Sequence, residues 1–549
     1  MKTNRILLLM ASASLLPVSL AAQSAIDAYN LSQNELRGTA RFMSMAGAFT
    51  ALGGDLSTLN QNPAGIGVYR GSDIGFTLDI NMMNAKTSAI GAPYAKSQTH
   101  ADVNNFGYVG TYNIGGSTAA TFSWGASYSR LGSFRRSYQG GNMAMQTSLS
   151  NYITTLTDGT SVDDLKFSDR FNPYQNWSQD APNWLSILAY NSGMISPVVA
   201  LDANNDPYET SSYDGLWQYP VNGQPQITPT TGSAAFKVNE EGYIDEYAID
   251  FGGSVANVFY WGIGLGITDL SFTQNAYYSE DLSHANVPAN SDMGVVEGNG
   301  YFSLGNWKHI SGTGVNAKFG IILKPVNELR IGLAVHTPTY WSVTTNYQGD
   351  TNFGYSSGVK GSEYTDEAAY DWKLNSPWKL QAGIAGVIGG RGILSVDYEY
   401  QGFNSMKTKN SHGDDYDYFN DDISAYFKST NTIRIGGEYR VTPQFSVRAG
   451  YAHQTSAVKD EAADNSLEIY TSGTNPAYTF DSDTQYITCG LGYRISGFYI
   501  DAAYVHKHRT STYHAFTPFK DYDGYWYDGP QAKVTDNNSQ LVFTVGYKF

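Results

Sequence analysis

A period of two dominates the chain from residue 73 to its end. In the first such segment Ile74, Phe76, Leu78, Ile80 and Met82 alternate with small or polar residues, so a strand there has one apolar and one polar face. A wall with lipid on one side and water or a ligand on the other requires this alternation. It recurs until fourteen candidate strands are counted, at residues 74–82, 106–114, 122–128, 247–255, 259–267, 315–323, 329–335, 378–384, 394–400, 433–439, 445–451, 487–493, 498–504 and 541–549.

Short and long links alternate between these segments. Short links lie at residues 115–118, 257–258, 324–328, 389–391, 442–444 and 495–497. Long links lie at residues 83–105, 131–246, 268–314, 343–377, 403–432, 452–486 and 505–540. Periplasmic turns and extracellular loops sort in this way. We therefore predict an all-β transmembrane fold, a 14-stranded antiparallel up-and-down barrel over residues 72–549 in the outer membrane of a Gram-negative bacterium.

Aromatic residues support the same interpretation. They stand at strand ends, where interfacial girdles form, at Trp261, Tyr340, Trp341, Trp378, Tyr400 and Tyr451. The last strand must pair with the first, because lipid tolerates no unpaired edge. Its aromatic end, Phe549, resembles the signal read by the outer-membrane barrel-assembly machinery, so we expect that machinery as a partner.

The segment before the first strand has a different character. Residues 1–22 carry Lys2 and Arg5 before a short apolar core, as a secretory signal peptide does. Residues 23–71 follow as a predicted hatch, a plug made of short helical pieces broken at Gly53-Gly54. Asn62 is a candidate N-cap and Pro63 suits the first helical position. A barrel of fourteen strands needs such a plug, because it is almost as wide as an open porin.

Composition narrows the class of protein. The 549 residues include 42 Tyr and 57 Gly, only 15% are charged, and the mean hydropathy is −0.34, values that suit alternating barrel strands. The net charge of −16 argues against a nucleic-acid partner. Cys489 is the only cysteine, so we expect no intrachain disulfide and no metal centre based on cysteine. We also expect no cofactor.

The hatch resembles that of the FadL/TodX family of outer-membrane transporters for long-chain fatty acids and aromatic hydrocarbons. The likeness rests on an Arg before a small-residue stretch, then Gly-Gly-Asp, Ser-Thr, and the motif Asn62, Pro63, Ala64 and Gly65. It implies passive uptake of a hydrophobic small molecule, which leaves laterally into outer-membrane lipid through a gap at a kinked third strand. By that likeness Gly125 is the expected bend, although glycine also occurs at ordinary barrel corners.

Two groups of apolar residues have more than one interpretation. The hatch residues Phe42, Met43, Met45, Phe49 and Leu52 either contact a ligand or pack as a plain plug. The largest predicted loop, about residues 131–246, exceeds what we expect for the family. Its apolar group is a lid, a partner site or the core of the loop itself, and consists of Trp177, Trp184, Leu185, Ile187, Leu188 and Met194.

Other functions rest on weaker patterns. A surface-binding or adhesive barrel would act through its long loops, and a hydrolase would need the G-x-S-x-G pattern at residues 354–358 to follow a buried strand and precede a helix. His506 and His508 lack a third metal ligand, and Asp202, Asn204 and Asp206 lack the rest of a calcium loop. We predict no enzymatic activity, no bound metal, and a monomer.

Overall fold

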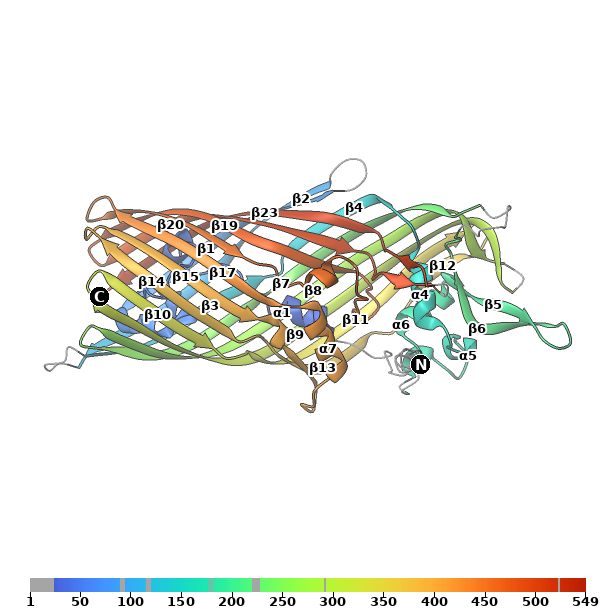
Figure 1. Cartoon of the computed structure of the whole chain (residues 1–549), viewed down its shortest axis with the longest axis horizontal. Helices are drawn as coiled ribbons and strands as arrows, with labels where there is room; N and C mark the ends of the chain where they lie inside the picture. Colours follow the sequence, from blue (N-terminus) through green and yellow to red (C-terminus); the bar gives the residue numbers. More distant parts are fainter. Residues whose placement is uncertain are drawn as a thin grey trace, which may run out of the picture.

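The computed structural model describes residues 24–88, 94–114, 120–176, 178, 181–219, 228–290, 293–521 and 524–549. The predicted signal peptide, residues 1–22, and Trp177 lie outside the described residues. Within them, fourteen strands form the wall of a barrel (Figure 1): β1 (Asp73–Ser88), β2 (Tyr94–Asn113), β3 (Thr121–Ser133), β7 (Thr231–Val255), β8 (Phe259–Pro288), β9 (Val295–Val326), β10 (Leu329–His336), β14 (Lys379–Ile388), β15 (Gly392–Gly402), β17 (Ser429–Arg440), β18 (Phe445–Gln454), β19 (Tyr478–Ile495), β20 (Phe498–His514) and β23 (Gln531–Lys548).

The wall is closed. Each strand pairs antiparallel with the next, and β23 returns to β1, with Tyr547 opposite Ile74 and Phe543 opposite Leu78. The chain ends in the same seam, where Phe549 N–H donates to the Ser72 carbonyl and Ser72 N–H donates to the Phe549 carbonyl, at 3.0 and 2.8 Å. The predicted count of fourteen strands and the pairing of the last strand with the first are confirmed.

Side chains alternate across the wall as predicted. On β1, Ile74, Phe76 and Leu78 are exposed on the outer face, whereas Thr77 and Asp79 are buried on the inner face. Trp378 and Tyr340 are also exposed on the outside, at 48% and 49%. The prediction that Trp341 belongs to a girdle is wrong: it follows Tyr340 on the strand and therefore faces inward, 5% exposed. No helix among the described residues is both long and apolar enough to cross a membrane.

Several predicted loops are strands instead. Residues 268–314, predicted as a loop, continue β8 and β9, which pair as far as Pro288 opposite Val295. β7 begins at Thr231, far ahead of the predicted residue 247. Beyond the lipid the outward positions become polar, as at Ser271, Thr273 and Asn275, so the apolar alternation ends although the strand does not.

The remaining elements lie in the long connections between these strands. They are β4 (Arg136–Ala144), α4 (Leu149–Thr157), α5 (Val162–Leu165), η2 (Pro173–Gln175), α6 (Trp184–Asn191), β5 (Ile195–Leu201), β6 (Pro207–Gly215), β11 (Tyr340–Tyr355), β12 (Lys360–Tyr364), β13 (Ala368–Asn375), η3 (Phe403–Ser405), β16 (Lys407–Asn410), α7 (Asp417–Tyr426), α8 (Asp460–Ala463), β21 (Phe519–Lys520) and β22 (Trp526–Tyr527). Some of them, such as β11 paired with β9, extend the wall. In Figure 1, α4, α5, α6, β5 and β6 gather at the end opposite the C-terminus, and we call this group of elements the cap.

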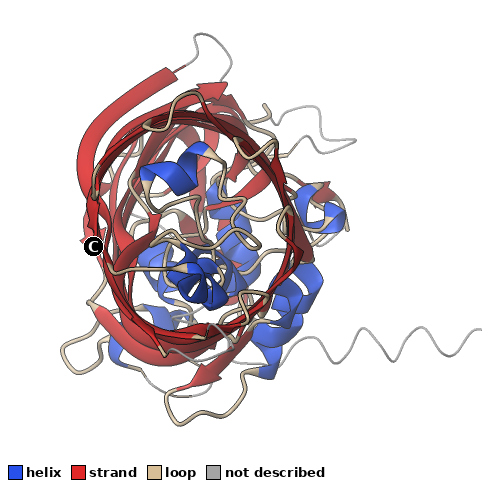
Figure 2. Cartoon of the chain, turned by 90° about the vertical axis from the view of Figure 1, so that its left-hand side faces the viewer, coloured by secondary structure: helices blue, strands red, loops and turns tan. Residues whose placement is uncertain are grey.

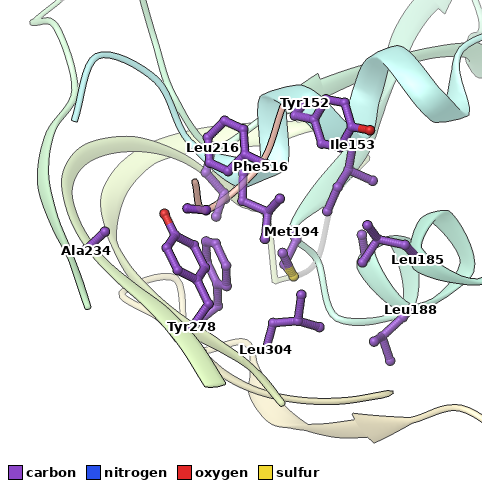
Figure 3. Packing of buried hydrophobic residues seen from close by; sticks show 14 of the residues in the cluster. Tyr152, Ile153, Leu185, Leu188, Met194, Leu216, Ala234, Tyr278, Leu304 and Phe516 are labelled. Carbon is purple, nitrogen blue, oxygen red and sulfur yellow. The ribbon is translucent and has the colours of Figure 1, made fainter. Parts of the chain in front are cut away.

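The largest connection has a core of its own, which we call the cap core. Leu185, Ile187, Leu188 and Met194 are at most 4% exposed and pack against side chains from the ends of the wall strands, as Figure 3 shows around Tyr278 and Leu304. The cap core also takes in Tyr513 and Val534 from β20 and β23. Of the three interpretations of this apolar group, the buried core fits the described residues, and it covers the extracellular end of the lumen.

The N-terminal segment lies inside the barrel. It forms α1 (Ala25–Leu31), α2 (Ala40–Ser44), α3 (Thr58–Gln61) and η1 (Pro63–Val68), and helices are visible within the ring of strands in Figure 2. The later pieces lie near the end that carries the short turns and the C-terminus (Figure 1). α1 packs higher in the lumen, where Tyr29 stacks on Phe427 with ring centroids 4.7 Å apart.

Candidate functional site

The hatch motif joins the plug to itself and to the wall. The Asn62 side chain caps η1 by accepting a hydrogen bond from Ala64 N–H at 3.1 Å, and it donates to the Thr50 carbonyl at 2.6 Å. Pro63 occupies the first position of η1, where a missing N–H costs nothing. Gly65 accepts from Gly54 N–H at 3.1 Å. The motif therefore closes the loop that contains Gly53-Gly54 and holds its ends together.

A ring of glycines lets the wall touch this plug, and we call it the glycine belt. A Cβ at Gly320 would overlap Asn62 Oδ1, one at Gly262 would overlap the Pro63 backbone, and one at Gly332 would overlap the Thr50 carbonyl. Eleven of the fourteen wall strands in the described chain contribute one such glycine, at Gly75, Gly107, Gly125, Gly252, Gly262, Gly320, Gly332, Gly383, Gly436, Gly450 and Gly490. The hatch thus sits in direct contact with most of the circumference.

The five apolar hatch residues named above are buried. Phe42, Met43, Met45, Phe49 and Leu52 are at most 7% exposed. They share one hydrophobic cluster with wall residues of β14, β18, β19, β20 and β23. Of the five, Phe42 borders the lumen cavity described below. Plug packing accounts for the other four, and ligand contact stays a prediction for this set.

A buried network of ion pairs ties the hatch to the wall at Arg41. Arg41 on α2 and Arg448 on the wall share Glu438, at 2.9 and 2.6 Å, and Arg448 also bonds Asp501 at 2.6 Å. Removing one partner of such a pair is costly, because a charge is left buried without compensation. Charge pairing and the glycine belt therefore act together to hold the plug in place.

A cavity of about 140 Å³ lies between the hatch, the segment that follows α1, and the wall. Its lining mixes apolar side chains, such as Leu36, Phe42 and Trp341, with many charged ones, whereas a hydrophobic ligand leads us to expect an apolar lumen. The cations are Arg37, Arg130, Lys318, Lys379 and Arg434, and the anions are Glu35, Glu246 and Glu399. An engineered apolar cavity of about 150 Å³ holds a benzene molecule. The space therefore suits a polar group of that size and not a whole long-chain molecule.

Most of these charges are paired across the lumen. Lys318 donates to Glu246 and to Asn60 of the hatch, and His336 Nε2 lies 2.8 Å from the Gln61 carbonyl. Arg434 Nη2 lies 3.3 Å from Glu399 Oε1. Two cationic groups can still donate hydrogen bonds. Arg434 Nη1 is buried without a hydrogen-bond partner, and the Lys379 ammonium group has no ion-pair or hydrogen-bond partner among the described residues.

The comparison with protein families decides the identity. Residues 263–549, which are 287 of the 549, match the family described as outer membrane protein transport protein (OMPP1/FadL/TodX). The chain belongs to this family. Its membership and the closed barrel place this OMPP1/FadL/TodX protein in the outer membrane of a Gram-negative bacterium, as the strand pattern predicts.

Solved structures of distant relatives resemble this OMPP1/FadL/TodX chain. A FadL homologue from Pseudomonas aeruginosa has 13% sequence identity and a TM-score of 0.49, with 94% of this chain and 99% of that chain covered. The P. putida toluene transporter TodX has 12% identity and a TM-score of 0.45, with the same coverage. The Ralstonia pickettii toluene transporter TbuX has 13% identity and a TM-score of 0.42, again with 94% and 99% covered. No curated protein matches the chain.

The third wall strand of this family member keeps its register through Gly125. β3 pairs with β2 from Thr121 to Ser129 without a shift, and its pairing with β7 shifts only beyond Arg130. A Cβ at Gly125 would lie 2.8 Å from Leu59 and 3.1 Å from Ile66, both in the hatch. Gly125 thus makes room for the plug, and an exit at strand three stays a prediction.

The weaker sequence patterns lie in ordinary structural contexts. The G-x-S-x-G pattern spans the end of β11 and a turn, and strand β12 follows where an elbow needs a helix. His506 and His508 share one face of β20 and bond Ser539 and Asn537 of β23. Asp202 accepts backbone N–H bonds within its own turn, and these bonds lower its pKa.

One buried carboxyl group stands out in the cap. Glu280 is fully buried on the part of β8 beyond the lipid, and it accepts from Leu149 N–H at 2.8 Å and Tyr278 OH at 2.7 Å. Burial raises its pKa to about 7, although the hydrogen bonds oppose the shift. Glu280 therefore ties the N-terminus of α4 to β8 and changes charge near neutral pH.

Sequence reasoning missed the belt and the charges above it. The glycines occupy inward positions of the predicted strands, so their spacing was visible, but nothing in the pattern said what they face. Glu246 and Lys318 lie on β7 and β9 and meet across Gly266 of the intervening strand, where a Cβ would lie 2.6 Å from the Glu246 carboxylate. Contacts between strands that are not neighbours leave no signal in a single sequence.

Proposed function

We propose that this protein is a passive outer-membrane channel for hydrophobic small molecules of the fatty-acid or aromatic-hydrocarbon class. The observation that carries the proposal is the seated hatch, which contacts eleven wall strands at the end with the short turns. A barrel plugged in this way is no open pore for water-soluble solutes. A molecule that enters its lumen and is delivered to the membrane must be soluble in lipid.

The names of related transporters agree with this class of cargo. Solved structures that resemble the chain include toluene transporters and a homologue of FadL. The charged cavity adds a condition of its own. Cargo with one polar or anionic end fits beside Arg434 and Lys379 better than a pure hydrocarbon, because Arg434 Nη1 and the Lys379 ammonium group still have hydrogen bonds to donate to an anion.

Transport into liposomes tests the proposal. Purified protein is reconstituted, and the entry of labelled dodecanoate, labelled toluene and labelled glucose is followed against protein-free vesicles. We expect faster entry of the first two and no change for glucose. Mass spectrometry of molecules that co-purify with the folded barrel should detect a lipid-soluble compound. Faster entry of glucose alone, with no hydrophobic ligand bound, would overturn the proposal.

A surface-binding function is the second candidate, and one observation favours it. The cap has its own buried core, and the β5–β6 hairpin projects from it (Figure 1). Replacing residues 198–212 by a short turn removes the projection but leaves the cap core. Loss of cell adhesion with dodecanoate entry unchanged would support surface binding, and unchanged adhesion would exclude a role for the hairpin.

A further inference from the structure

The wall is interrupted at one level on two neighbouring strands. β10 ends at His336 and β11 resumes at Tyr340, while β13 ends at Asn375 and β14 resumes at Lys379. His336 pairs with Lys379 below the interruption, and Tyr340 pairs with Asn375 above it. Between them residues 337–339 face residues 376–378, and we call these six residues the proline seam.

Few hydrogen bonds close the seam. Pro338 and Pro377 have no N–H to donate. In this part of the described chain, one backbone bond joins the two segments, from Ser376 N–H to the Thr339 carbonyl at 3.1 Å, and Thr339 N–H donates to the Ser376 hydroxyl at 2.8 Å. Thr337 N–H turns away to Ala317 of β9. The seam is thus weaker than a regular ladder of the same length.

The charged cavity lies directly inside the seam. Thr337, Thr339, Ser376 and Pro377 all line it. Lys379 is the first residue after the seam on β14, and its ammonium group has no hydrogen-bond or ion-pair partner among the described residues. Arg434 in the same lining has its Nη1 buried without a hydrogen-bond partner, and together with Lys379 it favours an anionic head group.

An apolar trough lies on the outer face beside the seam. Its volume is about 870 Å³, and it begins two residues from the seam at Val335 on β10 and Leu380 on β14. Aromatic side chains form its sides, at Trp261, Phe319, Tyr398 and Tyr400. Gln381 borders both the trough and the inner cavity, so a single pair of strands separates the two spaces.

Both ends of the lumen are closed by packing. The glycine belt lies below the seam, because Gly332 and Gly383 are about five residues nearer the short turns on the same strands, a distance of roughly 16 Å at 3.3 Å per residue. The cap core covers the other end. In contrast, β3 is paired on both sides through Gly125, which the hatch covers.

We propose that cargo leaves the lumen for the membrane through the proline seam, with its anionic head beside Lys379 and Arg434 and its apolar body in the outer trough. This inference rests on the proposed function and names its route and its cargo, a molecule with an anionic head and an apolar body. Opening requires residues 337–339 to part from residues 376–378 while the hatch stays in its belt.

Reversible cross-links test the route. In a Cys489→Ser background, the pair Val335→Cys and Leu380→Cys locks the seam, since directly opposed residues in a ladder lie within reach of a disulfide. The matched lock at strand three is Tyr108→Cys with Ala126→Cys, which are also opposed. Disulfide formation is verified by mass spectrometry, and the entry of labelled dodecanoate into liposomes is measured before and after reduction.

We expect the oxidised seam lock to lower dodecanoate entry to that of protein-free vesicles and reduction to restore it, while the strand-three lock has no effect. Full entry through the oxidised seam lock, or a block by the strand-three lock alone, would overturn the route. If the unlocked Cys489→Ser protein moves no hydrophobic probe, the proposed function fails, and the route fails with it.

A charge test examines the head-group site independently. Lys379→Met should weaken dodecanoate binding by roughly tenfold, the loss expected for one charge-assisted hydrogen bond. Binding of the methyl ester should be unchanged, because the ester carries no charge. Equal effects on the acid and its ester would exclude Lys379 as a head-group contact.

Discussion

The glycine belt makes a sharp prediction at Gly436 and its neighbour Gly437. Both are on β17, but they face opposite sides of the wall. A Cβ at Gly436 would lie 2.5 Å from the Met45 carbonyl oxygen and 2.8 Å from Met45 Cβ, whereas the nearest atom to a Cβ at Gly437 is 3.7 Å away. Gly436→Ala therefore pushes on the hatch, and Gly437→Ala adds the same methyl group without touching it.

The hatch has little room to yield at this point. Gly450 of β18 is paired with Gly436, and its own Cβ would lie 2.5 Å from the Met45 carbonyl carbon. Met45 is fully buried, and the next residue, Ala46, already has a positive φ of 53°. Overpacking of this kind costs about 1–3 kcal/mol. We expect the same loss in the free energy of hatch docking.

Conductance measures the effect. A loss of about 2 kcal/mol raises the undocked population more than tenfold. Single channels in planar bilayers should then open to ions correspondingly more often in Gly436→Ala. Gly437→Ala controls for the general effect of alanine in a strand. If the two variants share the same rate of openings, the belt does not hold the hatch.

Three further perturbations probe other parts of the molecule. Burial raises the pKa of Glu280 from 4.5 to about 7, so the cap should lose up to roughly 3 kcal/mol of stability as pH rises from 4.5 through 7. Thermal unfolding at pH 5 and pH 8 should show a smaller change in melting temperature for Glu280→Gln than for the unaltered protein. An equal change in both proteins would refute this. Deleting Phe549 removes both hydrogen bonds to Ser72, so less folded barrel should reach the outer membrane. The amount is measured from the heat-modifiable mobility of the folded barrel on gels. An unchanged yield would count against a role of Phe549 in closing the barrel. In the unaltered protein, Lys308 Nζ lies 2.6 Å from Asp27 Oδ1. Lys308→Met leaves the Asp27 carboxylate buried without this cation, which costs about 3–5 kcal/mol and should speed amide hydrogen exchange in α1. Equal exchange rates in the two proteins would contradict this prediction.

The alternation of side chains identified every wall strand because lipid imposes it on each of them. The strand from Ile74 to Met82 could be assigned without knowing its neighbouring strands, because its alternation depends on the bilayer alone. The extracellular strand ends could not be assigned in this way. At Ser271 and Asn275 the outer face of β8 is polar, while Leu270 and Phe272 on the inner face are buried. The apolar outer face that marks a lipid-facing strand is therefore missing, although the ladder to β9 continues.

For a related reason, the sequence predicted the capped turn of the hatch but not its contacts with the wall. Asn62 and Pro63 showed a capped turn because capping is local in sequence. The partners of that turn, Gly320 and Gly262, are more than 190 residues away, and nothing local connects them. The same holds for charge: inward positions of a barrel are polar in any case, so whether Lys379 meets an anion depends on the register of strands that no periodicity records.

Two barriers to transport can be compared: release of the hatch from the wall and opening of the proline seam. Release of the hatch would expose the buried side chains of Phe42, Met43, Met45, Phe49 and Leu52, and at about 1.5–3 kcal/mol each this costs on the order of 10 kcal/mol before any ion pair is broken. Opening the proline seam breaks one backbone bond and one hydroxyl bond, each worth about 1 kcal/mol. The plug therefore has reason to stay fixed while the wall beside it opens. The seam lock and Gly436→Ala separate the two motions, since the first should block cargo without ion leakage and the second should cause ion leakage without blocking cargo.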